Sequence, residues 1–347
     1  MLLLPLVFAG LIAAAFGFSA WKASAIEAEF PNGGELVDVG GFSMNSLHVP
    51  ARAPAECPPI VFIHGASGNL KDQETAFRRP LEGRAELLFV DRPGHGYSER
   101  GGPENGFPDG QAAAIARLME KRGIGRAIIC GHSFGAAIAA SFALHHPEKT
   151  LGLLLLAPAT HPWPGDIDWY YKLAKRPFSG WLFSRLLALP AGLALIERAT
   201  HSVFHPNPRP ETYLSDGAPA LVLRPKAFRH NAIDVANLNE YVTRVSPRYR
   251  EIAAPTIVVT GDSDAIVAEE IHSRGLARDI EGSELVFIRN LGHKPDYMAT
   301  DVVIAAIEKL SGFERDLEAA ARIAETRLAP RAAEPEPIID LSIEKTS

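Results

Sequence analysis

Residues 131–135 read Gly-His-Ser-Phe-Gly and lie between the apolar run Ala-Ile-Ile-Cys at 127–130 and an alanine-rich stretch. The apolar run is typical of a strand that is buried on both faces, and the stretch after the motif has a helical composition. Ser133 therefore lies at a sharp turn from strand to helix, where the helix N-terminus offers free N–H groups. Such a turn strains the backbone and needs small neighbours two positions away, which Gly131 and Gly135 provide. In this setting the pattern predicts that Ser133 is a nucleophile.

A serine hydroxyl is a weak nucleophile unless a base activates it and an acid orients that base. When a serine occupies a turn of this kind, its partners follow along the chain in the order acid, then histidine. The last apolar run, at 285–288, is followed by a glycine-containing loop with His293, which we predict to be the base. The preceding apolar run is followed by two aspartates. We favour Asp264 as the acid, because Asp262 adjoins a glycine and is typical of a turn residue.

The tetrahedral intermediate of acyl transfer carries a negative oxygen that needs hydrogen-bond donors. One predicted donor is the backbone N–H of Phe134, the residue after the nucleophile. The other is expected from the loop His-Gly-Ala-Ser-Gly at 64–68, whose glycines let it approach Ser133 closely. We assign this second donor to the N–H of Ala66. Ser67 can add its hydroxyl, although a surface serine is the more ordinary interpretation of that position.

Outward from the motif, short apolar runs alternate with helical stretches, which favours a mainly parallel sheet covered by helices on both faces. The predicted strands are 35–39, 43–49, 60–63, 87–90, 127–130, 151–157, 256–260 and 285–288, and the predicted helices are 110–122, 134–146, 268–279 and 297–310. The alternation stops between 161 and 250, where Pro and aromatic residues are frequent and where 12 Lys and Arg occur with 7 Asp and Glu. We predict a helical insertion there, placed over one end of the sheet.

The first 22 residues have the composition of a membrane segment. No charge occurs from Leu2 to Trp21, and twenty helical residues span about 30 Å, the thickness of the hydrocarbon core of a bilayer. A cleavable signal peptide is the alternative, since Ala-Ser-Ala at 23–25 resembles a processing site. We favour an uncleaved single-pass anchor, because the apolar run exceeds the usual signal-peptide h-region of about 7–15 residues and no basic residue precedes it. The few flanking charges leave the side of the membrane open.

Composition excludes several classes of protein. The chain has 347 residues, 47% of them hydrophobic and 22% charged, and a net charge of −6, which fits neither a disordered polyelectrolyte nor a nucleic-acid-binding protein. Its two cysteines, Cys57 and Cys130, exclude a disulfide scaffold and a multi-cysteine metal site. The sequence has no HExxH zinc motif, no Walker loop and no GxGxxG after a strand, so we expect no metal and no nucleotide cofactor.

Taken together, these motifs resemble those of the α/β-hydrolase superfamily. Five stretches occur in the order of that family, namely HGASG at 64–68, DRPGHGYS at 91–98, GHSFG at 131–135, GDSDAIV at 261–267 and LGHKP at 291–295. The resemblance implies an eight-stranded, mostly parallel sheet with an antiparallel second strand, and a helical cap where the insertion lies. We interpret 91–98 as a rigid structural turn, with Asp91 and His95 bonding loop backbone. One departure is HKPDYM at 293–298, where relatives often have a glutamate after the proline.

The predicted layout has five parts. These are a transmembrane anchor (1–22), the first part of the α/β-hydrolase core (35–160), the helical cap (161–250), the second part of the core (251–312), and a polar helix with a disordered tail (313–347).

The resemblance implies a cofactor-free serine hydrolase, because a serine occupies position 133 where dehalogenases and epoxide hydrolases have an aspartate. Our first hypothesis is a membrane-anchored enzyme that cleaves a lipophilic carboxylic ester or lipid through Ser133, His293 and Asp264. The same residues could instead serve C–C bond hydrolysis, amide hydrolysis or perhydrolysis. A third hypothesis is a non-catalytic homologue that binds a ligand under the cap. No nucleic-acid partner is expected.

Overall fold

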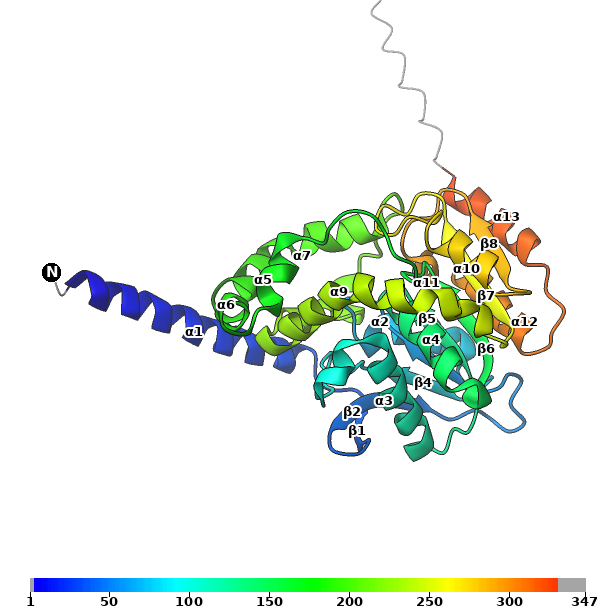
Figure 1. Cartoon of the computed structure of the whole chain (residues 1–347), viewed down its shortest axis with the longest axis horizontal. Helices are drawn as coiled ribbons and strands as arrows, with labels where there is room; N and C mark the ends of the chain where they lie inside the picture. Colours follow the sequence, from blue (N-terminus) through cyan, green and yellow to red (C-terminus); the bar gives the residue numbers. More distant parts are fainter. Residues whose placement is uncertain (1–2, 330–347) are drawn as a thin grey trace, which may run out of the picture.

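The apolar runs of the sequence form a single eight-stranded sheet in the computed structural model, which describes residues 3–329 (Figure 1). The strand order is β1-β2-β4-β3-β5-β6-β7-β8. β2 runs antiparallel to both of its neighbours, β1 and β4, and the remaining pairs are parallel. The strands are β1 (Glu35–Asp38), β2 (Ser43–Val49), β3 (Ile60–Ile63), β4 (Leu87–Val90), β5 (Ala127–His132), β6 (Thr150–Leu156), β7 (Thr256–Gly261) and β8 (Glu284–Ile288).

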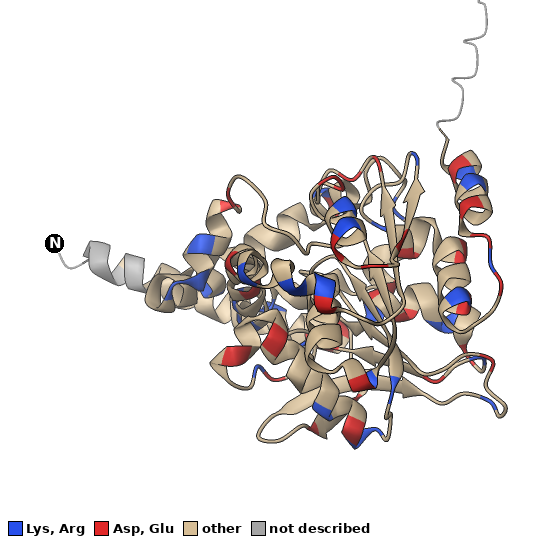
Figure 2. Cartoon of the chain, turned by 45° about the vertical axis from the view of Figure 1, so that its right-hand side comes forward, with Lys and Arg blue, Asp and Glu red and all other residues tan. Residues whose placement is uncertain are grey.

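Helices cover both faces of the sheet. The helices α3 (Pro108–Lys121), α4 (Phe134–His145) and α10 (Ser273–Asp279) pack on one face, and α2 (Leu70–Leu81), α12 (Thr300–Leu310) and α13 (Leu317–Leu328) pack on the other. Along β5 the side chains alternate between the two cores, because Ile129 lies in the first and Ile128 in the second. Burial on both faces explains why the central strands read as unbroken apolar runs, and Figure 2 draws them without charged residues.

The chain between β6 and β7 is helical and forms the cap. It contains α5 (Trp169–Lys175), α6 (Pro177–Phe183), η3 (Ser184–Ala188), α7 (Leu189–Phe204), α8 (Tyr213–Asp216), η4 (Pro219–Leu223), α9 (Pro225–Val245) and η5 (Ser246–Glu251). The longest of these helices, α9, extends from the outer part of the cap back onto the core beside α4 (Figure 1). The buried residues Leu238, Tyr241 and Val242 of α9 belong to the same core as α3 and α4.

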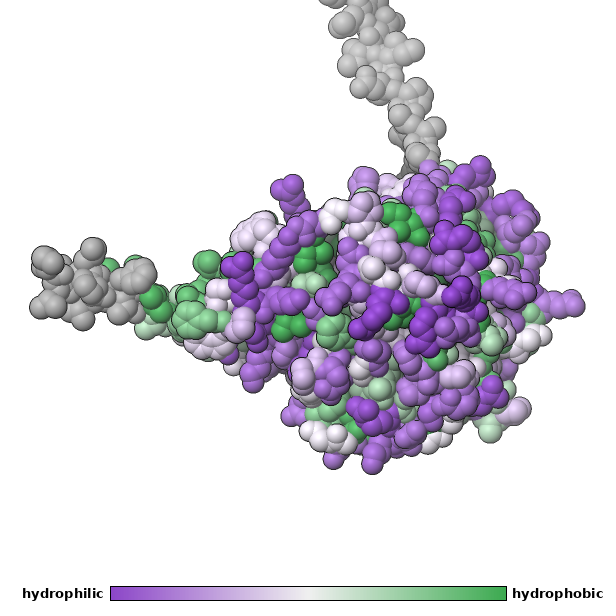
Figure 3. All heavy atoms as spheres, in the orientation of Figure 1, coloured by the Kyte–Doolittle hydropathy of each residue, from purple (hydrophilic) through white to green (hydrophobic). Residues whose placement is uncertain are grey.

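A long N-terminal helix, α1 (Leu3–Glu29), projects from the cap side of the molecule (Figure 1). The part of this helix that is coloured in Figure 3, next to the body, is largely apolar, and Leu11 and Trp21 are about two-thirds exposed. Its last turns are fixed to the body. Ile26 is buried with cap residues, and Glu27 pairs with Arg224 of the cap at 2.7 Å.

Among the described residues, the segment with the length and apolar composition to cross a membrane is Pro177–Phe204, which runs through α6, η3 and α7 of the cap. Residues 10–29 of α1 do not meet the same criteria. The single-pass anchor at 1–22 therefore stays a prediction.

Helix boundaries are where the structure departs most from the sequence analysis. The helix α2 was not predicted, because its twelve residues are mostly polar and its start depends on Asn69, whose side chain accepts a hydrogen bond from the N–H of Lys71. The predicted helix 297–310 is divided into α11 (Pro295–Met298) and α12, because the backbone of Ala299 is non-helical. The predicted helix 268–279 begins only at Ser273. The predicted disordered tail from 330 lies outside the described residues.

Candidate active site

The turn between β5 and α4 has the geometry that a nucleophile needs. Ser133 has φ +54° and ψ −117°, a strained conformation for a residue with a side chain. A Cβ on Gly131 would lie 2.3 Å from the carbonyl oxygen of Gly135, and a Cβ on Gly135 would lie 2.2 Å from the carbonyl oxygen of Ile63. Neither position can therefore hold a larger residue without displacing backbone. The strain at Ser133 is maintained by close packing on both sides of it.

His293 and Asp264 lie side by side in the loops that follow the carboxyl ends of β8 and β7. The Nδ1 of His293 and the Oδ2 of Asp264 are 2.7 Å apart, and both side chains are at least 95% buried. Burial by itself would raise the pKa of Asp264, but the neighbouring His293 and the backbone N–H groups of Val267 and Ile266 outweigh it and hold this pKa below the ordinary value. The carboxylate is thus ionised at neutral pH and can orient the imidazole.

Asp262, the competing aspartate, is used elsewhere. Its Oδ1 accepts hydrogen bonds from the backbone N–H of Asn290 and from the hydroxyl of Ser263. Asp262 thus stabilises the turn, and the carboxylate that contacts His293 is that of Asp264.

His132, the residue before Ser133, contacts His293. The Nε2 of His132 donates to the backbone carbonyl of His293 at 2.8 Å, and the two imidazole rings have centroids 4.9 Å apart. Within residues 3–329 the Ser133 hydroxyl makes no hydrogen bond to the imidazole of His293. Catalytic hydrogen bonds are often long in a free enzyme and tighten when substrate binds.

The two predicted oxyanion donors belong to segments that adjoin Ser133. A Cβ on Gly65 would come 3.1 Å from the Cβ of Ser133, so the 64–68 loop approaches Ser133 closely. In the described part of the chain, the N–H groups of Ala66 and Phe134 donate to no protein acceptor. Both are therefore available to a substrate oxygen. The hydroxyl of Ser67 instead accepts a hydrogen bond from Asn231 of the cap at 3.0 Å.

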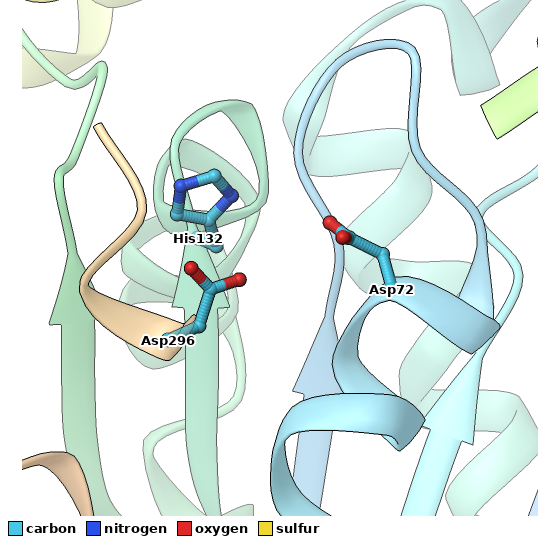
Figure 4. A group of neighbouring side chains, drawn as sticks. All are labelled: Asp72, His132 and Asp296. Carbon is cyan, nitrogen blue, oxygen red and sulfur yellow. The ribbon is translucent and has the colours of Figure 1, made fainter. Parts of the chain in front are cut away.

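A buried charged cluster lies directly behind the His293 loop. Asp72 of α2, Asp296 of α11 and His132 at the end of β5 point toward one another (Figure 4), and their ligating atoms lie within 4.8 Å. Such a set could in principle hold a metal ion. The Nζ of Lys294, however, lies 2.9 Å from a carboxylate oxygen of each aspartate. The ammonium group already supplies the positive charge that the two buried carboxylates need, so these residues do not fit a metal.

Electrostatics favour a charged Lys294 and a neutral His132 in this cluster. Burial alone would lower the pKa of Lys294, but Asp296 and Asp72 outweigh that effect and raise it above the ordinary lysine value. Burial lowers the pKa of His132 well below 6.5, and nearby Lys294 lowers it further. A charged lysine beside a neutral histidine therefore supports the backbone on both sides of His293. The residues after His293 depart from the pattern of relatives in the sequence, but this role was not predicted.

The 91–98 loop has the structural role that the sequence analysis gave it. Asp91 accepts hydrogen bonds from the backbone N–H groups of Leu70 and Tyr97 at 2.7 and 2.9 Å. His95 contacts the carbonyl oxygen of Pro93 at 3.3 Å. Arg92, which the sequence analysis passed over, is fully buried and extends under the 64–68 loop, where its Nη2 donates to the carbonyl of Gly65.

The model of a known family, the alpha/beta hydrolase fold, matches residues 58–295. The chain belongs to the α/β-hydrolase fold family. The predicted superfamily and its eight-stranded sheet are therefore confirmed. The matched range of this α/β-hydrolase includes Ser133, Asp264 and His293.

Individual relatives differ in chemistry. Lipase 1 of Psychrobacter immobilis is 26% identical over 248 residues, which cover 70% of this chain and 73% of the lipase. A proline iminopeptidase of Pestalotiopsis fici is 29% identical over 286 residues, which cover 79% of this chain and 97% of the peptidase. Among solved structures, a bacterial membrane phospholipase A superposes with a TM-score of 0.62 at 22% identity, covering 89% of this α/β-hydrolase and 96% of the phospholipase. At that identity the last likeness shows the fold alone.

Proposed function

We propose that the chain is a serine hydrolase that cleaves carboxylic esters. The observation that carries the proposal is the pairing of His293 with Asp264 at the sheet edge where Ser133 occupies a strained turn. Relatives named as lipases support an ester as the substrate. The N–H groups of Ala66 and Phe134, which donate to no acceptor in the described part of the chain, support stabilisation of a tetrahedral oxyanion.

In the proposed mechanism, the hydroxyl oxygen of Ser133 attacks the ester carbonyl carbon while the Nε2 of His293 accepts the hydroxyl proton. The intermediate collapses, the bond to the alcohol oxygen breaks, and the alcohol leaves with the proton from His293. Water, deprotonated by His293, then attacks the acyl carbon; the bond to the Ser133 oxygen breaks, His293 returns the proton to Ser133, and the acid is released. Asp264 stabilises the imidazolium that forms in each half of the reaction.

A fluorophosphonate probe and a series of p-nitrophenyl esters test this proposal. We expect the probe to label Ser133 in the folded wild-type chain, and Ser133→Ala to abolish labelling and lower kcat by about 10⁴-fold or more. Unchanged turnover in Ser133→Ala would refute the mechanism. A proline p-nitroanilide assay tests amide hydrolysis, the reaction named for the iminopeptidase relative.

The chain length of the preferred acyl group tests the lipophilic substrate that we propose. Support comes from the lipase relatives and from a cap with 12 Lys and Arg against 7 Asp and Glu, which suits anionic headgroups. Activity that peaks on acetyl esters and vanishes beyond butyryl esters would exclude a lipid substrate.

We further propose that residues 1–22 anchor the enzyme in a membrane. The uncharged segment from Leu2 to Trp21 supports this, as does the course of α1, which continues as one helix through the Ala-Ser-Ala sequence at 23–25. A signal peptidase would have to cut inside that helix. Membrane fractionation with alkaline carbonate and N-terminal sequencing provide the test. We expect an intact chain that resists extraction, whereas a mature chain that begins at Ile26 would contradict the anchor.

A further inference from the structure

The oxyanion loop at 64–68 is held partly by the cap. Two residues of α9, Asn231 and Asp234, lie one helical turn apart and are almost completely buried. Asn231 contacts the loop directly, and Asp234 contacts it through Arg92. Figure 1 shows α9 crossing from the cap onto the core.

The contact through Arg92 fixes the peptide unit before Ala66. The carbonyl oxygen of Gly65 accepts hydrogen bonds from the Nδ1 of His64 at 2.8 Å and from the Nη2 of Arg92 at 3.2 Å. A trans peptide is planar, so its N–H points opposite to its carbonyl. Holding the Gly65 oxygen therefore also fixes the direction of the Ala66 N–H, which is the proposed oxyanion donor.

Arg92 is itself held by the cap. Its Nη1 lies 3.0 Å from the Oδ2 of Asp234, and both side chains are fully buried. Its guanidinium also lies 4.5 Å from the ring centroid of Phe134, the residue that carries the other proposed donor. One side chain from the 91–98 loop thus contacts both donor segments while it is ion-paired to α9.

The direct contact of Asn231 fixes the peptide unit after Ala66. The Oδ1 of Asn231 accepts from the N–H of Ser67 at 2.7 Å, and its Nδ2 donates to the Ser67 hydroxyl at 3.0 Å. Ser67 has φ +58°, a conformation that is unfavourable for serine and needs support from its surroundings. Ala66 is consequently flanked by two peptide units that depend on α9.

We propose that α9 of the cap aligns the oxyanion hole, with Asn231 and Asp234 as positioning residues. The inference rests on the proposed function of Ala66 and Ser133. It makes transition-state stabilisation conditional on a docked cap, so that displacement of α9 misdirects the Ala66 donor without altering Ser133, His293 or Asp264.

The test compares Asn231→Ala with Asn237→Ala. Asn237 is a buried asparagine on the same helix that holds the cap to the core through the carbonyl of Gly106 at 3.0 Å, without contacting the oxyanion loop. Complete loss of an oxyanion donor costs about 10²–10³-fold in kcat, so we expect Asn231→Ala to lower kcat about 10- to 100-fold. KM for p-nitrophenyl butyrate should stay within about twofold, and Asn237→Ala should keep kcat within about threefold.

Butaneboronic acid provides a second readout, because its tetrahedral adduct with a serine places an oxygen in the oxyanion hole. Its affinity should fall in Asn231→Ala by the same factor as kcat. Asn231→Asp keeps an acceptor for the Ser67 N–H and should bind the boronate more tightly than Asn231→Ala, which separates alignment from a general folding defect.

Equal boronate affinity in Asn231→Ala and the wild type would overturn the inference and leave the hydrolase assignment intact. A loss of equal size in Asn237→Ala would also overturn it. Failure of the wild type to bind the boronate or react with a fluorophosphonate would refute the proposed function as well.

Discussion

Replacing Lys294 with methionine tests the buried cluster behind the His293 loop. The lysine is 2% exposed, and its Nζ lies 2.9 Å from the carboxylates of both Asp72 and Asp296. Methionine retains most of the side-chain volume but leaves two buried carboxylates without a cation. Removing one partner of a buried ion pair costs about 3–5 kcal/mol. At roughly 2 °C per kcal/mol for a chain of this size, the midpoint of thermal unfolding should fall by about 6–10 °C.

Differential scanning calorimetry at pH 7 measures this effect, with Lys309→Met as the matched control. Lys309 forms an ion pair with Glu284, but both side chains are more than one-third exposed, so its loss should cost about 1 kcal/mol at most. Adding Asp72→Asn and Asp296→Asn to the Lys294 variant should recover much of the loss, because no charge is then left unpaired. Midpoints of the two lysine variants within about 2 °C of each other would refute the reasoning.

Three further predictions follow from the site and its surroundings. Asp264→Asn should lower kcat by about 10⁴-fold, as expected when a catalytic imidazole loses its orienting carboxylate, whereas Asp262→Asn should change steady-state kcat by less than about tenfold. Burial lowers the pKa of His272 to about 4. The unfolded chain therefore takes up a proton first as the pH falls below 6.5, and stability decreases toward pH 4 by up to about 1.4 kcal/mol per pH unit from this group. Urea unfolding at several pH values should show that the free energy of unfolding depends less steeply on pH in His272→Gln. An unchanged pH dependence would contradict a lowered pKa of His272. Gly135→Ala should destabilise the fold by several kcal/mol through its backbone clash, whereas Gly125→Ala, with open space around it, should unfold at the wild-type urea concentration.

The sheet and the turn at Ser133 could be predicted because their signals are local. An apolar run, a glycine at each flank of Ser133 and an alanine-rich helix occupy fewer than twenty consecutive residues. The choice of Asp264 over Asp262 was predicted from turn position, and the structure pairs Asp264 with His293. The turn at Ser133 is determined by residues close to it in the sequence. The position of Asp264 follows from the order in which the family motifs occur along the chain.

The supports of the site could not be predicted, because their partners are distant in sequence. Asn231 and Ser67 are 164 residues apart, and Lys294 and Asp72 are 222 apart. Asn231 lies in an amphipathic helix whose composition gives no sign that one buried amide faces the core. A buried lysine is also unusual enough that its residue type alone favours an exposed position. Only the packed fold shows which charges and amides meet.

The docking of α1 has a practical consequence for work with the isolated enzyme. A chain shortened to begin at Glu35, the first residue of β1, would lack Ile26 and Phe30 and would leave their apolar partners Leu189 and Leu221 facing water. We expect such a truncation to aggregate during purification. A chain that starts at Ala23 retains the apolar contacts of Ile26 and Phe30 and should stay monodisperse in gel filtration.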